Sequence, residues 1–114
     1  RGCCGVQYAV EADGSVYPCD FYVMDEYQIG NFNTDSFDQM DQKRSEIRFI
    51  EQSSQVEKAC RSCHYFLLCR GGCRRNRGNG IQTEPTRNNF CEGYKIFFEK
   101  WYDTLMQLGK LVQR

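Results

Sequence analysis

Alternating residues near the start of the chain predict a β-hairpin. In segment 7–18, Tyr8 and Val10 alternate with smaller or polar residues, and the apolar pattern resumes after an Asp-Gly pair. An Asp-Gly pair between two short apolar runs is a strong hairpin signal, because both residues tolerate the positive φ angles of a tight turn. Two further apolar pieces, at 21–24 and 28–32, predict one more strand.

Two later stretches place apolar residues three and four positions apart, which predicts helices. The first runs from 34 to about 52, with Thr34 or Asp35 as the expected N-cap. The second, from 88 to about 112, has the clearer pattern and begins with two asparagines suited to capping. Its stripe indicates a core or a docking face and consists of Phe90, Tyr94, Phe97, Phe98, Trp101, Leu105, Leu108 and Val112.

Length and charge indicate a modest module. The chain has 114 residues, which suffice for one domain or part of one, and its 15 Lys and Arg balance 15 Asp and Glu. Zero net charge gives no general attraction to nucleic acid, and no apolar run approaches the roughly 20 residues of a membrane span. We therefore expect no nucleic acid and no membrane among the partners. We also expect a cytoplasmic location. Because the chain starts at Arg1 without a Met, we expect it to be part of a longer protein, and the lack of a signal peptide then says little about that protein.

The cysteine content changes this picture. Eight cysteines in 114 residues lie far above average usage. Four of them form a C-x2-C-x5-C-x3-C run from Cys60 to Cys73, and Cys91 follows in the first turn of the predicted C-terminal helix. Thiolates this close together indicate soft-metal binding, with an iron–sulfur cluster or zinc as the leading occupants.

The cysteine pattern also allows three other interpretations. Cys60, Cys63, Cys69 and Cys73 have a spacing that allows all four to bind one zinc ion, which would make the chain a structural or interaction module. Eight cysteines also suffice for four disulfides in an oxidising compartment. Finally, the C-x-x-C-H sequence that ends at His64 is a haem attachment pattern, although it would leave the later cysteines without a role.

A second spacing adds to the first. Nine residues separate Cys4 from Gly14, and four separate Gly14 from Cys19. Together with the run at 60–73 and Cys91, this pattern resembles the SPASM domain, which follows the barrel of certain radical S-adenosylmethionine enzymes. The sequences at 10–20 and 68–73 are similar to those of the anaerobic sulfatase-maturating enzymes. The resemblance covers nearly the whole chain.

This resemblance implies an α+β fold stapled by metal. It would comprise a half-knottin-like N-terminal hairpin, a middle helix, a cysteine-rich loop and a long C-terminal helix, as a single domain over residues 1–114. Two auxiliary [4Fe–4S] clusters are implied. The first would be bound by Cys4, Cys19, Cys73 and a fourth ligand upstream of Arg1, and the second by Cys60, Cys63, Cys69 and Cys91. Two-cluster ferredoxins likewise send the last cysteine of a tight run to the other cluster.

The same resemblance implies a function for the parent enzyme. It would oxidise a Cys or Ser of a sulfatase polypeptide to Cα-formylglycine, with S-adenosylmethionine and a third cluster on a barrel that this chain lacks. The chain would position the polypeptide and carry electrons, and would be inactive alone. By the same resemblance, Asp20 matches an aspartate proposed to accept the substrate proton, the role of a general base. Alternatively, its carboxylate only accepts hydrogen bonds from nearby backbone amides in a turn. Cys3 is expected not to be a ligand, because adjacent residues rarely direct both side chains at one metal.

Basic residues surround the cysteine run, namely Arg61, Arg70, Arg74, Arg75 and Arg77. We expect them to balance the negative charge of thiolate-bound clusters and to donate hydrogen bonds to sulfur. The pair Gly71-Gly72 would let the backbone approach a cluster closely. A nucleic-acid patch is a weaker interpretation, because the net charge is zero and no aromatic stacking platform is evident.

Overall fold

The computed structural model describes residues 2–81 and 84–112, which belong to two compact units. Unit 1 comprises residues 1–55 and unit 2 residues 56–114. Unit 1 has 4 Lys and Arg against 10 Asp and Glu, a net charge of −6, whereas unit 2 has 11 against 5, a net charge of +6. The zero net charge of the whole chain therefore combines an acidic unit with a basic one.

Unit 1 begins with the predicted hairpin. The strands β1 (Ala9–Val10) and β2 (Ser15–Tyr17) are antiparallel, and β3 (Gly30–Asn31) pairs antiparallel with the other edge of β2. Gly14 in the hairpin turn has φ +86, and a Cβ there would lie 2.5 Å from the Asn33 side chain, so the turn needs glycine. The hairpin and a strand within 28–32 are thus confirmed. The apolar piece at 21–24 overlaps a 3-10 turn, η1 (Asp20–Tyr22), and η2 (Asp25–Tyr27) follows.

The predicted middle helix is two helices, α1 (Phe37–Glu46) and α2 (Phe49–Ser54). They are separated at Arg48, whose φ of +51 is left-handed. The N-cap of α1 is Ser36, so the expected caps Thr34 and Asp35 were wrong. Ser36 forms a capping box with Gln39, in which each side chain accepts the other residue's backbone N–H. The Asp35 carboxylate instead accepts the backbone N–H of Asn31, at 2.8 Å.

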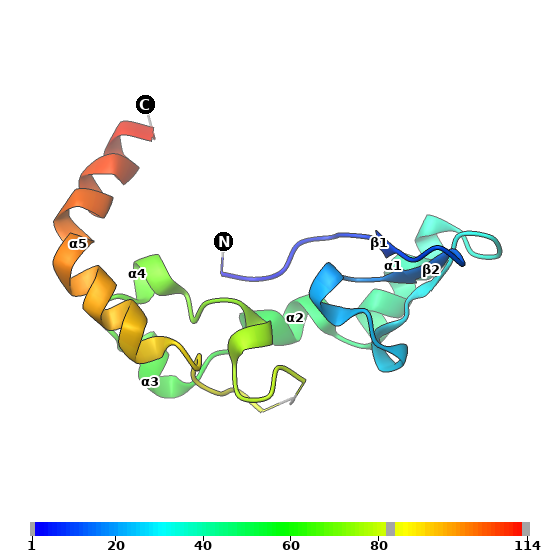
Figure 1. Ribbon diagram of the computed structural model, residues 1–114, viewed down its shortest axis with the longest axis horizontal. Helices are drawn as coiled ribbons and strands as arrows, with labels where there is room; N and C mark the ends of the chain where they lie inside the picture. The colour runs from blue at the N-terminus through cyan, green and yellow to red at the C-terminus, as the bar shows by residue number, and fades with distance from the viewer. Residues whose placement is uncertain (1, 82–83, 113–114) are drawn as a thin grey trace. The chain divides into compact units, whose positions relative to one another are not determined.

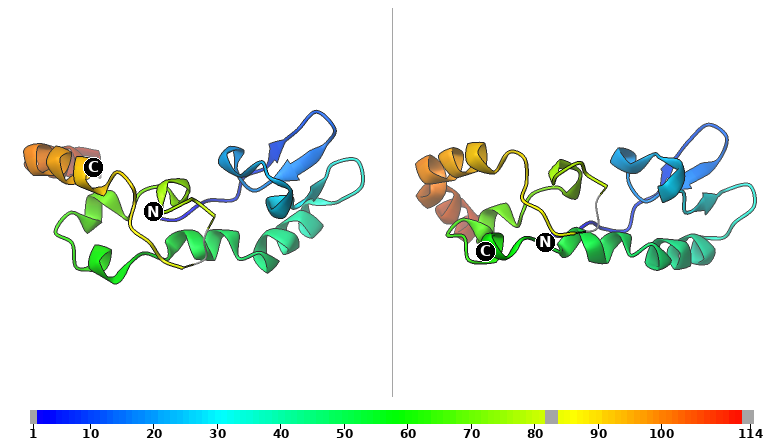
Figure 2. Two further views of the ribbon diagram at one scale, coloured as in Figure 1. Left: turned by 60° about the horizontal axis from the view of Figure 1, so that its bottom comes forward. Right: turned by 90° about the horizontal axis from the view of Figure 1, so that it is seen from below.

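The core of unit 1 lies between the sheet and the helices. Val16 of β2, Ile29 and Met40 of α1 form one buried cluster. Phe49 of α2 is fully buried, and its ring meets that of Tyr22 edge-on with the centroids 5.0 Å apart. Figure 2 shows the hairpin on one side of α1 and α2 within this unit. Unit 1 therefore has a packed apolar core of its own.

A buried arginine connects the start of the hairpin to α1. The Arg44 side chain is 3% exposed, lies over the Tyr8 ring and donates hydrogen bonds to Asp41 and to the Gln7 carbonyl oxygen. The Tyr8 hydroxyl also donates to Asp41. These hydrogen bonds, from Tyr8 and then from Arg44, hold the pKa of Asp41 below its ordinary value of 3.8.

We expect Asp41→Asn to destabilise the chain at neutral pH and to have a smaller effect in acid. A carboxyl whose pKa is lower in the folded state stabilises the fold fully above its unfolded pKa, and this contribution is lost as the pH falls through the folded pKa. Urea midpoints of the wild type and the variant should therefore converge between about pH 7 and about pH 2. Glu26→Gln removes an exposed carboxylate and is the control; a wild-type advantage over Asp41→Asn that persists in acid would contradict the expectation.

Unit 2 consists of short turns followed by one long helix (Figure 1). The turns are α3 (Lys58–Arg61), α4 (Phe66–Cys69) and the 3-10 turn η3 (Arg74–Asn76), and the helix is α5 (Cys91–Val112). The long C-terminal helix is thus confirmed, and with it the α+β class. It begins after Asn88, whose side chain accepts the backbone N–H of Phe90.

One face of α5 packs against the cysteine-rich turns, where His64 meets Tyr102 and Tyr65 meets Phe98 with ring centroids 4.8 and 5.9 Å apart. No described residue of α5 is fully buried. Much of its apolar stripe is exposed, including Phe97, Trp101, Leu108 and Val112. In residues 2–81 and 84–112, no helix is both long and apolar enough to span a bilayer.

Candidate metal centre

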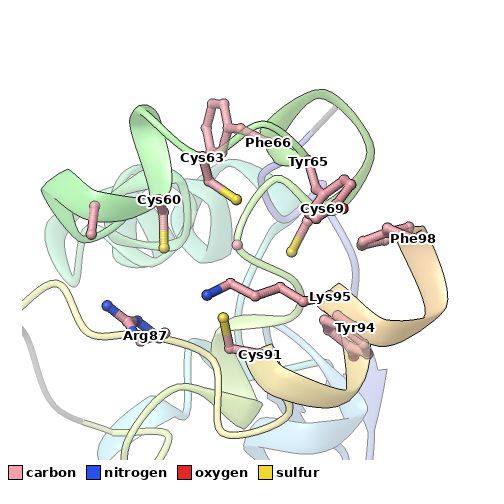
Figure 3. Close-up of a pocket in the computed structure, with 12 residues that line it drawn as sticks. Cys60, Cys63, Tyr65, Phe66, Cys69, Arg87, Cys91, Tyr94, Lys95 and Phe98 are labelled. Atoms are coloured by element: carbon pink, nitrogen blue, oxygen red, sulfur yellow. The ribbon is translucent and has the colours of Figure 1, made fainter. Parts of the chain in front are cut away.

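Four cysteines of unit 2 line one cavity of about 210 Å³. They come from Cys60 of α3, Cys63 in the turn after it, Cys69 at the end of α4 and Cys91 at the start of α5. Figure 3 shows the four sulfur atoms directed into the same space. Aromatic rings form much of the remaining wall, from Tyr65, Phe66, Tyr94 and Phe98. The structure thus brings together the four residues of the second predicted ligand set.

The sulfur atoms are spread around the cavity. Among the described residues, no three His, Cys, Asp or Glu side chains lie close enough together to hold one metal ion. A zinc ion has Zn–S bonds of about 2.3 Å, so four thiolates around it must lie within about 4 Å of one another. A cluster of several irons accepts one thiolate at each iron and suits sulfurs that are farther apart. Four thiolate donors around one cavity are the donor set that a [4Fe–4S] cluster takes.

The backbone reverses sharply between Cys69 and Cys73. Arg70, Gly71 and Gly72 all have left-handed φ angles, of +53, +82 and +63. After this reversal, Cys73 is exposed and is not among the residues that line the cavity. The arrangement disfavours one ion held by four successive cysteines of the run, because the fourth would lie outside the cavity.

Arg77 fixes this reversal from a buried position. Arg77 is 5% exposed. Its guanidinium donates from Nε to the Gly71 carbonyl oxygen at 3.0 Å and from Nη2 to the Gly72 carbonyl oxygen at 2.7 Å. Its backbone pairs with Asn88, three residues before Cys91. The sequence predicts that Arg77 balances the charge of a cluster. In the structure its guanidinium binds the backbone between Cys69 and Cys73.

We expect Arg77→Ala to lower the free energy of unfolding by about 2–4 kcal/mol, because it leaves two carbonyl oxygens without their charged donor. Arg75→Ala is the matched control, since Arg75 is exposed in the same turn and donates to the carbonyl oxygen of Asn79. Its cost should stay within about 0.5 kcal/mol. Urea unfolding of both variants measures the difference, and equal losses would show that Arg77 has no special role.

Two cations that the sequence did not single out also line the cavity. Arg87 forms an ion pair with Glu57 at 3.1 Å, and Lys95 one with Glu92 at 3.5 Å. Each lies four residues from Cys91. For Lys95 this spacing could have been read from the sequence, because residues four apart on a helix share one face. Burial raises the pKa of the Cys60 thiol, and the Glu57 carboxylate raises it further.

Cys4 and Cys19, two members of the first predicted ligand set, both lie in unit 1. The Cys4 backbone N–H donates to the buried Ser53 hydroxyl at 2.8 Å. Burial raises the pKa of the Cys19 thiol, with smaller contributions from Asp20 and from Cys4. The third member, Cys73, belongs to unit 2, and the set remains a prediction.

Asp20 directly follows Cys19 and begins η1. Its carboxylate accepts a hydrogen bond from the Cys19 thiol, with Sγ and Oδ1 3.3 Å apart. The predicted proton acceptor is therefore next to a predicted ligand, and its catalytic role remains a prediction.

The other interpretations of the cysteines receive no support from the structure. All eight cysteines are free thiols, which argues against four disulfides. Cys60 and Cys63 face Cys69 and Cys91 across one cavity, whereas His64 stacks against Tyr102. Cys69 and Cys91 therefore share one site with Cys60 and Cys63, whereas a haem attachment site would use only Cys60 and Cys63.

Comparisons with known proteins support the iron–sulfur interpretation. Residues 3–64 match the SPASM family, described as an iron–sulfur cluster-binding domain. A cysteine-type anaerobic sulfatase-maturating enzyme from Clostridium novyi is 40% identical over 96% of this chain and 29% of its own length. A serine-type enzyme from Bacteroides thetaiotaomicron is 31% identical over 84% of this chain and 24% of its length.

A solved structure gives the same result for the fold. Native anSMEcpe with bound AdoMet and Kp18Cys peptide superposes with a TM-score of 0.84 at 38% identity, over 96% of this chain and 30% of that one. The chain therefore spans less than a third of the length of these relatives. The similarity extends over both units described above.

Proposed function

Because the chain belongs to the SPASM family of iron–sulfur cluster-binding domains, we propose that it binds two [4Fe–4S] clusters. Cys60, Cys63, Cys69 and Cys91 would hold one. Cys4, Cys19 and Cys73 would hold the other, with a fourth ligand upstream of Arg1. Such clusters, when bound, accept and release single electrons. The observation that carries the proposal is one cavity lined by four cysteines, whose sulfur atoms are directed into the same space.

We further propose that the chain is the C-terminal domain of a longer enzyme. That enzyme would oxidise a Cys or Ser of a sulfatase polypeptide to Cα-formylglycine, using S-adenosylmethionine and a third cluster on a preceding barrel. Sequence identity to sulfatase-maturating enzymes over 96% of the chain supports this role, and the higher identity to the cysteine-type relative favours a cysteine substrate. Eight free thiols suit the reducing cytoplasm. The chain alone would be inactive.

The experiment for this function uses the full-length enzyme, S-adenosylmethionine, a reductant and a peptide that carries a sulfatase's target cysteine. We expect mass spectrometry to detect conversion of that cysteine to formylglycine. Cleavage of S-adenosylmethionine without any change in the peptide would contradict the proposed substrate.

Asp20 is proposed to accept the substrate proton in this reaction. We expect Asp20→Asn in the full-length enzyme to leave iron and sulfide contents unchanged and to slow peptide oxidation by about 10²-fold or more, the usual size of a general-base contribution. Asp25→Asn, which changes an exposed acid in the next 3-10 turn, is the control and should keep its rate. Loss of cluster from Asp20→Asn would mean that the carboxylate is structural, and an unchanged rate would remove it from the reaction.

A further inference from the structure

A single ammonium group reaches into the four-cysteine cavity. Lys95 lies on α5 one turn after Cys91, so the two side chains share a helix face. Lys95 is among the residues that line the cavity, and Figure 3 shows its extended side chain ending there, with the nitrogen directed into the space that the cysteine sulfurs surround.

The local ion pairs leave this charge available to the cavity. Arg87, the other cation on the cavity wall, is paired with Glu57 at 3.1 Å. The partner of Lys95 is Glu92 at 3.5 Å, and the two side chains are 43% and 79% exposed. Exposed pairs of this kind are weak because water screens them. The Lys95 ammonium is therefore only loosely committed to its carboxylate.

Aromatic rings line the cavity beside Lys95. Tyr94 and Phe98 flank Lys95 along α5, and Tyr65 faces them from the turn before α4. These rings cover part of the space around the sulfurs, and charges interact more strongly where water is limited. An ammonium group has three N–H donors and no acceptor, so it interacts favourably with anionic sulfur.

We propose that Lys95 raises the reduction potential of the cluster held by Cys60, Cys63, Cys69 and Cys91. This inference rests on the proposed cluster in unit 2. Reduction adds one electron to the cluster, and a fixed positive charge stabilises the more negative, reduced form over the oxidised form. Net charge and hydrogen bonds to sulfur are among the factors that set the potentials of such clusters. Lys95 accordingly makes the cluster a better electron acceptor.

The test measures potential and cluster content together. Lys95→Met and Lys95→Arg are prepared in the full chain with Cys4 and Cys19 replaced by serine, so that only the unit 2 cluster is reconstituted. Iron and acid-labile sulfide are assayed, and the reduction potential is followed by electron paramagnetic resonance in a redox titration. Lys100→Met, on the exposed side of the same helix, is the matched control.

We expect Lys95→Met to bind as much iron and sulfide as its parent and to have a lower reduction potential. Lys95→Arg should restore most of the potential, because it keeps the charge, and Lys100→Met should leave it unchanged. An unaltered potential in Lys95→Met, or loss of its cluster, would overturn the inference. A parent chain that binds neither iron nor sulfide would overturn the proposed cluster itself, and the inference with it.

Discussion

Cys69→Ala is expected to abolish cluster binding in unit 2 and to unfold the turns that line the cavity. Cys69 supplies one of the four sulfurs from the end of α4. Among the described residues of unit 2, Val56 is the only hydrophobic residue counted as buried, whereas unit 1 has six. A small unit with so little core needs a staple, and metal binding in such units is coupled to folding.

The size of this effect follows from mass action. A group present at 1,000 times its dissociation constant stabilises the folded state by about 4 kcal/mol, and a variant that cannot bind it loses that contribution. Iron and sulfide content and the thermal unfolding curve measure the loss. Cys3→Ala, at an exposed cysteine predicted not to be a ligand, is the control and should change neither. Full metal content and unchanged thermal stability in Cys69→Ala would refute the assignment.

Phe49→Ala is expected to unfold unit 1. Phe49 is fully buried and meets Tyr22 and Tyr27 edge-on, with ring centroids 5.0 and 6.0 Å apart. Truncating a buried phenylalanine costs about 3–5 kcal/mol, and the total stability of a small domain is only about 5–15 kcal/mol.

The measurement is urea unfolding followed by circular dichroism. Phe21→Ala is the matched control, since Phe21 is 61% exposed and its truncation should cost no more than about 0.5 kcal/mol. A shift in Phe49→Ala no larger than that in Phe21→Ala would show that packing at Phe49 does not hold unit 1 together.

Local sequence signals were sufficient where the structure depends on neighbouring residues. The hairpin follows from alternation around an Asp-Gly turn, and the long helix from its three- and four-residue spacing. The break between α1 and α2 was missed because it occurs at Arg48 in a left-handed conformation, which no glycine, proline or asparagine at that position announces. The N-cap is Ser36 and not Asp35, because the Asp35 carboxylate accepts the backbone N–H of Asn31 at the end of β3.

The site was predictable in its residues but not in its supporting contacts. Spacing identified the cysteine run, and resemblance to a family separated Cys73 from Cys69. The burial of Arg77 depends on contacts with Gly71 and Gly72 that only the folded turn creates. The sequence presents Lys95 as one polar position within an aromatic stripe, and its relation to the cavity emerges once the turns pack against α5. The opposite charges of the two units were likewise hidden in a net charge of zero.

The identity of the group bound in the four-cysteine cavity can be measured directly. The measurement is elemental analysis of the full chain, with Cys4 and Cys19 replaced by serine, after anaerobic reconstitution with iron, sulfide and zinc all present. We predict about four irons and about four acid-labile sulfides per chain, as a [4Fe–4S] cluster requires. One zinc per chain without sulfide would contradict the account.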